Sequence, residues 1–210
     1  MKTFRIHIIF SIASILLLTS CNNSYTPEQK EYIASIEQSR QEKDDWMKND
    51  SLSPFTRDTT AHFSPLKYFP VNPEYVFYSK LYNYSQQDTV TIFGTKGEER
   101  RVVRYGYVLW NREGIDIAIT VYKGTSKKGI EYFSIWFTDK TTGKETYGVG
   151  RYLDFTYVPD PEHLYTIDLN LAYSPYCAYS PMYSCAIPSK EDYIDVAIEA
   201  GEKTFHTGAH

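Results

Sequence analysis

Two cysteines, Cys177 and Cys185, lie eight positions apart in an irregular stretch that is rich in tyrosine and proline. In an exported protein, where disulfides persist, a bridge between them would stabilise the stretch by about 2–3 kcal/mol. Two buried free thiols, packed as small apolar groups, are the second interpretation. A zinc site would need further ligands such as His62 or His163, and the spacing of a zinc motif is absent, so we expect no metal. A catalytic Cys177 would need His163 as its base.

Polar side chains alternate with apolar ones just before this stretch. Thr166, Asp168 and Asn170 share one face of a predicted strand over residues 164–171. Such a face is either solvated or forms the wall of a polar pocket. The following loop favours the pocket, because tyrosines are large, rigid and amphipathic side chains that suit the rim of a binding site.

Arg151 is the predicted charge partner of Asp168. The pair is either an internal ion pair that fixes the strand register or a clamp on a ligand carboxylate or phosphate. Glu202 could join Asp168 as a carboxylate pair of the glycosidase type if the two converge. The candidate ligand-binding residues are Arg151, Asp168, Asn170, Tyr173, Tyr176, Cys177, Tyr179 and Glu202.

The elements that must position these residues are mainly short strands. Alternating apolar residues predict strands at 75–84, 89–93, 101–110, 115–123, 130–137, 151–158 and 164–171, with turns between them. This pattern predicts a mainly β fold, an antiparallel meander closed as a barrel or packed as a sandwich. Residues 192–203 fit a helix or a strand, and their alternating β-branched residues favour the strand.

A helix is predicted ahead of the strands. Thr26, Pro27 and Gln29 supply an N-cap, a proline at the first helical position and the third residue of a capping box. The helix has a thin apolar stripe and is predicted to end at residues 50–54, so part of it could serve as a stalk.

The first twenty residues resemble a secretory signal peptide, with Lys2 and Arg5 before a short apolar run. The segment that ends in Cys21 resembles the lipobox of bacterial lipoproteins, which implies acylation of Cys21 and anchoring to a membrane. We therefore predict a signal peptide at 1–20, a lipidated tether and helix at 21–60, and a β domain at 61–210.

Charge and composition exclude several classes of function. The chain has 22 Lys and Arg against 26 Asp and Glu, and removal of the signal peptide takes away two positive charges, which leaves a formal charge of about −6. An acidic chain without basic clusters is not expected to bind nucleic acid. No nucleotide-binding or hydrolase motif is present, no cofactor is expected, and a monomer is expected.

Nearly all of the chain after Cys21, including the upstream segment "SRQEKDDWMKNDSLSPF", resembles the domain-of-unknown-function 1684 family. The resemblance is carried by "FTDKTTGKETYGVGRYLD" and by "IDLNLAYSPYCAYSPMYSCAIPSKEDYIDVAIEAGEK". Departures from the family pattern include Leu169, Ser174 and Ala186. The resemblance implies the fold outline and the location of the site but no reaction.

We therefore expect an envelope lipoprotein that binds a small polar ligand, a glycan or a peptide near residues 151 and 168–185. A hydrolase that uses Asp168 or Glu202 with Arg151 is the alternative. A structural subunit that docks through an exposed stripe at Tyr32, Ile33 and Ile36 is the second alternative.

Overall fold

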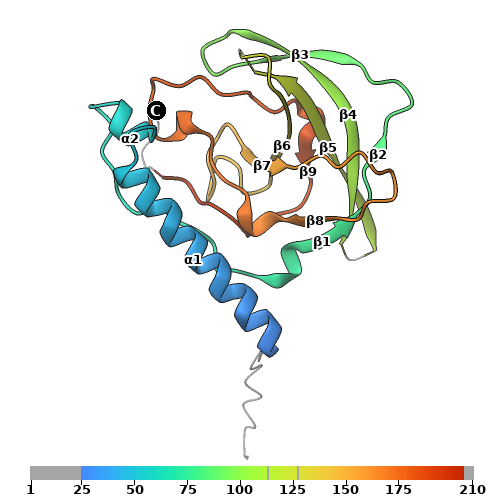
Figure 1. The fold of residues 1–210 in the computed structure, drawn as a ribbon, viewed down its shortest axis with the longest axis horizontal. Helices are drawn as coiled ribbons and strands as arrows, with labels where there is room; N and C mark the ends of the chain where they lie inside the picture. The colour runs from blue at the N-terminus through green and yellow to red at the C-terminus, as the bar shows by residue number, and fades with distance from the viewer. Residues whose placement is uncertain (1–24, 113, 127, 206–210) are drawn as a thin grey trace, which may run out of the picture.

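A computed structural model describes residues 25–205 of the chain except positions 113 and 127. The predicted signal peptide and the lipidation at Cys21 lie outside these residues. The described part consists of a long N-terminal helix that packs against a mainly antiparallel β domain (Figure 1). None of its helices is both long enough and apolar enough to cross a membrane.

Helix α1 (Pro27–Asn49) begins as predicted. The Thr26 side chain accepts a hydrogen bond from the Gln29 N–H, and the Gln29 side chain accepts one from the Thr26 N–H, which completes a capping box. The helix packs on the β domain along its length, so it is not a free stalk. Ile36 and Met47 are buried, and the Arg40 guanidinium donates to the Phe69 carbonyl oxygen at 3.0 Å.

In the described part of the chain, nine strands form two sheets. The larger sheet has the order β2 (Tyr82–Asn83), β4 (Glu99–Arg112), β5 (Ile115–Thr125), β6 (Glu131–Asp139) and β7 (Arg151–Phe155), and β3 (Thr89–Phe93) also pairs with β4. The smaller sheet pairs β1 (Val76–Ser79) with β8 (Tyr165–Asp168). Within the described residues β2 and β7 do not pair, so the larger sheet is open, and the fold is sandwich-like rather than a closed barrel.

The main core lies between the large sheet and the β1–β8 pair. Val108, Val121, Ile135 and Leu169 are completely buried there, each worth about 1.5–3 kcal/mol of apolar burial. The opposite face of the large sheet is also covered, because Trp136 stacks on Tyr122 beneath the loop that contains Ala186. The sequence pattern of β5 alone does not reveal this second covered face.

Short connecting helices interrupt or follow the strands. They are α2 (Pro54–Arg57), η1 (Pro73–Tyr75), η2 (Leu169–Leu171), η3 (Tyr176–Ala178) and η4 (Lys190–Asp192). Helix η2 ends the predicted strand at Asp168, because the Asp168 side chain accepts from the Asn170 N–H and caps the turn. As a result, Leu171 is exposed although strand alternation places it in the core.

The predicted C-terminal strand is short. Only Tyr193–Ile194 forms a strand, β9, which pairs in parallel with β6. Beyond the end of β9, the carbonyl oxygens of Ile198 and Ala200 accept hydrogen bonds from the Arg151 guanidinium. A buried side chain therefore replaces the strand ladder here.

Candidate functional site

Arg151 lies in the core and faces no ligand site. Its side chain and that of Asp139 are both completely buried, with 2.7 Å between Arg151 Nη2 and Asp139 Oδ2. Burial lowers the pKa of Arg151, and the charge of Asp139 opposes that effect. The predicted pairing of Arg151 with Asp168 is therefore wrong. The antiparallel pairing of β6 with β7 sets Phe137 opposite Arg151, so Asp139 at the end of β6 lies close to Arg151, whereas Asp168 lies at the end of β8.

Glu202 is also buried, and its two carboxylate oxygens are occupied. Lys43 Nζ of α1 lies 2.9 Å from one oxygen, and the Tyr179 hydroxyl donates to the other. Burial, and then the charge of Glu202, raise the pKa of Tyr179, which keeps this phenol a donor. Glu202 and Tyr179 thus attach the helix to the β domain.

Asp168 and Asn170 attach the helix at a second point. The Tyr32 hydroxyl donates to Asp168 Oδ2 at 2.7 Å and accepts from Asn170 Nδ2 at 3.0 Å. Asn170 also exchanges two hydrogen bonds of 2.9 Å with the backbone of Asn72. Tyr32 is thereby engaged and Ile36 is buried, so the apolar stripe proposed for docking packs against the protein itself.

Asp168 and Glu202 do not converge on one bond. They contact α1 at Tyr32 and Lys43, and eleven residues of helix separate these positions by about 16 Å along the axis. Glycosidase carboxylates lie about 5–9.5 Å apart. The geometry therefore does not support the carboxylate pair that the hydrolase alternative requires.

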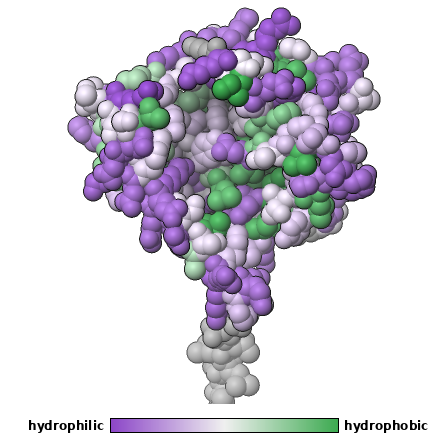
Figure 2. All heavy atoms as spheres, viewed as in Figure 1, coloured by the Kyte–Doolittle hydropathy of each residue, from purple (hydrophilic) through white to green (hydrophobic). Residues whose placement is uncertain are grey.

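A groove of about 510 Å³ lies between α1 and β7. Its lining is mainly apolar and aromatic, and two of the lining residues are charged. The residues that line it are Lys43, Trp46, Met47, Leu153, Asp154, Leu171, Tyr173 and Tyr176. A neighbouring hollow of about 320 Å³ shares Leu153, Asp154 and Leu171 with it and reaches His163 and Asp168. On the face drawn in Figure 2, hydrophobic residues gather in a hollow beside α1, with hydrophilic residues around them. We call the 510 Å³ space the α1 groove.

The side chains of the α1 groove form a defined polar and aromatic arrangement. The rings of Trp46 and Tyr176 are stacked, with centroids 6.4 Å apart and planes inclined by 21°. The Tyr173 hydroxyl donates to Asp154 Oδ1 at 2.7 Å, and Lys43 Nζ lies 5.0 Å from the centre of the Tyr173 ring. Burial raises the pKa of Tyr173, so its phenol stays a hydrogen-bond donor at neutral pH. The groove thus offers flat apolar surfaces bordered by a cation and a carboxylate.

The eight predicted site residues are distributed over several places. Tyr173 and Tyr176 line the α1 groove, and Asp168 lines the adjoining hollow. Arg151, Glu202, Tyr179 and Asn170 are buried in the framework beneath them. The remaining candidate is Cys177.

Sequence reasoning missed six of the eight residues that line the groove, and three of these have polar or aromatic side chains. Lys43 and Trp46 stand three positions apart on α1 and so share one face, which is a signal that the sequence does contain. Asp154 alternates with the buried Leu153 and Phe155 on β7. What could not be inferred is that the helix face would lie against this strand.

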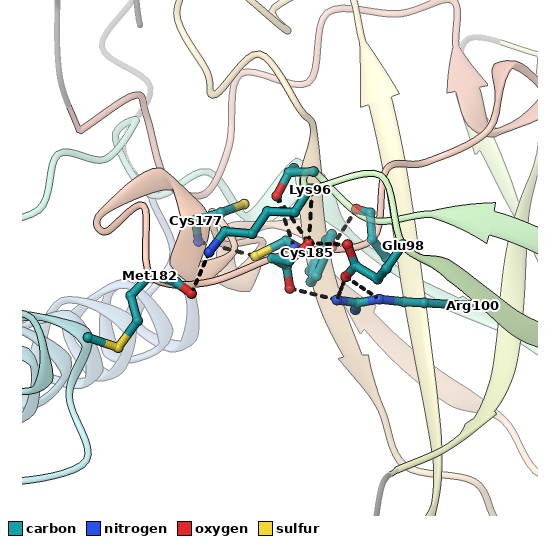
Figure 3. A network of polar contacts seen from close by, with 10 residues as sticks. Lys96, Glu98, Arg100, Cys177, Met182 and Cys185 are labelled. Carbon is teal, nitrogen blue, oxygen red and sulfur yellow. Dashed lines mark hydrogen bonds and ion pairs between the residues drawn. The ribbon is translucent and has the colours of Figure 1, made fainter.

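The two cysteines lie close together in the structure. Both are free, and the Cys177 N–H donates to Cys185 Sγ at 3.1 Å (Figure 3). Cys185 is buried and Cys177 half-buried. No group of three or more His, Cys, Asp or Glu side chains in the described part of the chain could hold a metal ion.

The fold and the groove define an antiparallel, sandwich-like β domain with an N-terminal helix as one wall of a cleft. The chain belongs to the family described as "Protein of unknown function (DUF1684)", whose model matches residues 61–203. The family resemblance expected from the sequence is thereby confirmed.

A solved structure supports the same fold. The solution NMR structure of an uncharacterised protein from Haloarcula marismortui is similar to this chain, with 26% identity and a TM-score of 0.60. The match covers 86% of this chain and 98% of that one. No curated protein matches the chain.

Proposed function

We propose that the protein is a lipid-anchored envelope protein that binds a glycan in the α1 groove. The observation that carries the proposal is the stacked pair Trp46 and Tyr176, which lies next to Lys43 and Asp154 in one open cleft. A sugar ring has an apolar C–H face and a polar rim. Aromatic planes suit the face, and the charged and hydroxyl groups at the edge suit the rim.

Binding without turnover agrees with the chemistry of the site. Glu202 is a buried carboxylate that contacts the groove residue Lys43. Both of its oxygens already accept hydrogen bonds. Asp154 accepts a hydrogen bond from Tyr173 and has no second carboxylate beside it among the groove residues. The groove therefore has positioning groups but lacks the paired carboxylates of a glycosidase.

The test uses tryptophan fluorescence of the full chain. Trp110 and Trp136 are buried, whereas Trp46 lines the groove, so ligand binding should change the emission of Trp46 alone. Neutral oligosaccharides and soluble peptidoglycan fragments are titrated into the protein. We expect saturable quenching by at least one of them, absent in Trp46→Phe.

A matched pair of variants separates binding from folding. Tyr176→Ala should weaken binding about tenfold or more, which corresponds to about 1.4 kcal/mol. Tyr78→Ala changes an exposed tyrosine outside the groove and should leave the affinity unchanged. Equal effects of the two substitutions, or quenching that persists in Trp46→Phe, would contradict the proposed groove.

The anchor is tested separately. Cys21→Ser should move the protein from the membrane fraction to the soluble fraction, and mass spectrometry of the N-terminal peptide should find acyl chains on Cys21 only in the wild type. An unmodified Cys21 in the membrane-associated protein would refute this part of the proposal.

A further inference from the structure

Cys177 and Cys185 form a contacting thiol pair that the α1 groove does not use. The Cys177 N–H donates a hydrogen bond to Cys185 Sγ at 3.1 Å, so the two cysteines are neighbours across the loop. Figure 3 shows the backbone of Cys177 directed at the Cys185 sulfur, next to the residues that hold this segment. Exchange between thiol and disulfide requires two neighbouring cysteines, one of which an incoming disulfide can reach. Cys177 and Cys185 are neighbours, and Cys177 is only half-buried.

Cys185 is fixed to the turn between β3 and β4. Its N–H donates to Thr95 Oγ1 at 3.2 Å, and its carbonyl oxygen accepts from the Thr95 N–H at 2.9 Å. The preceding residue, Ser184, donates to Glu98 and accepts from Arg100. Cys185 is therefore the immobile and more enclosed member of the pair.

Cys177 is the more accessible and more acidic thiol. It lies on η3, and its carbonyl oxygen accepts from the Tyr147 hydroxyl at 3.2 Å. The neighbouring Cys185 side chain lowers the pKa of Cys177 to about 7, against the opposing effect of burial, and the nearby hydroxyl groups of Tyr147 and Thr95 add to this lowering. The same neighbour and burial raise the pKa of Cys185, which is also the more enclosed of the two thiols. The other titratable groups that face the pair are Tyr152, Tyr173 and Arg100.

We propose that Cys177 and Cys185 are a thiol–disulfide exchange pair, with Cys177 as the attacking thiol and Cys185 as the resolving thiol. The Cys177 thiolate attacks one sulfur of an incoming disulfide, forms a mixed disulfide and releases one thiolate. Cys185 then loses its proton and attacks the Cys177 sulfur, which forms the internal disulfide and releases the second thiolate. The incoming disulfide gains two electrons, and the two protons of the cysteines end on the released thiols.

The experiment uses the full reduced chain and oxidised glutathione as the disulfide. Peptide mapping by mass spectrometry assigns each thiol, so that Cys21 is followed separately. In the folded wild type we expect an internal Cys177–Cys185 disulfide without retained glutathione, which dithiothreitol reverses under native conditions. Cys185→Ser should retain glutathione on Cys177, because no resolving thiol is present. Cys177→Ser should react roughly tenfold more slowly than Cys185→Ser.

A second measurement does not depend on the variants. Limited alkylation of the folded wild type should label Cys177 roughly tenfold faster than Cys185, with a pH midpoint of about 7. Three outcomes would overturn the proposal: preferential labelling of Cys185, reaction with oxidised glutathione only in denaturant, or an internal disulfide that dithiothreitol reduces only in denaturant. The first outcome would mean that Cys177 is not the attacking thiol, and either of the other two would mean that the pair is an inert structural feature.

Discussion

Arg151 and Asp139 form an ion pair in which neither side chain has any exposed surface. The guanidinium also donates to the carbonyl oxygens of Ile198 and Ala200, so one side chain connects β7, the end of β6 and the C-terminal segment. Because the charges are desolvated, the pair is not strongly stabilising by itself, but the loss of one partner leaves the other charge unpaired in the core.

Arg151→Met should destabilise the protein by about 3–5 kcal/mol, because it leaves the Asp139 carboxylate buried without its cation. Urea denaturation measures the loss as a lower midpoint. The double variant Arg151→Met, Asp139→Leu should recover much of the stability, since it removes both charges. A double variant that is no more stable than Arg151→Met would show that the bonds to Ile198 and Ala200 dominate.

Lys43→Met should also destabilise the protein by about 3–5 kcal/mol, because Glu202 is completely buried and Lys43 supplies its counter-charge. Adding Glu202→Gln to this variant should restore part of the loss, as the remaining amide needs no cation. The control is Lys140→Met, whose ion pair with Asp195 is exposed and is worth about 0–1 kcal/mol. Equal losses for the two lysines would contradict the role of Lys43.

Tyr32→Phe should lower stability by about 1–3 kcal/mol, because its hydroxyl satisfies both Asp168 and Asn170. Thermal unfolding followed by circular dichroism measures the change. Tyr78→Phe, which removes a hydroxyl from a side chain that is 65% exposed, should be nearly neutral. If both variants unfold at the wild-type temperature, the hydroxyl of Tyr32 does not hold the helix.

Glu98→Gln should reduce the loss of folding stability that occurs when the pH is lowered. The hydrogen bonds from Ser184 and then Arg100 lower the pKa of Glu98 from 4.5 to about 2. A depressed folded-state pKa means that this contribution is fully present above about pH 4.5 and is lost as the pH falls towards about 2. The urea midpoint measured between these values should therefore fall less in Glu98→Gln than in wild type. Parallel curves would exclude Glu98 as a source of acid sensitivity.

The positions of the central strands and the start of α1 could be predicted from the sequence, because both depend on local patterns. The separate pairing of β1 with β8 and the parallel pairing of β9 with β6 could not, because they join distant segments. Capping at Thr26 and alternation in β4, β5 and β6 are properties of neighbouring residues. The end of β8 at Asp168 was missed because a side-chain cap competes with alternation there. The alternation of apolar and polar residues gives no information about such a side-chain cap.

The candidate site was predicted only in part, since it depends on contacts between distant segments. Tyr173 and Tyr176 were expected at the site because the loop is rich in tyrosine, and they do line the groove. Arg151 was expected there as the charge partner of Asp168, yet the sequence does not distinguish Asp139 from Asp168 as its partner. Trp46 lies on α1, far along the chain from Tyr176, and only the docking of the helix brings the two rings together.

The position of the groove along α1 has a consequence for an anchored molecule. Nineteen residues separate Pro27 from Trp46, which corresponds to about 28 Å of helix, close to the thickness of a bilayer's hydrocarbon core. If Cys21 holds the chain at a membrane, α1 acts as a spacer whose far end carries the cleft. Polymers of the cell wall or solutes in the surrounding water would then be the accessible ligands, whereas the acyl chains of neighbouring lipids would be out of reach.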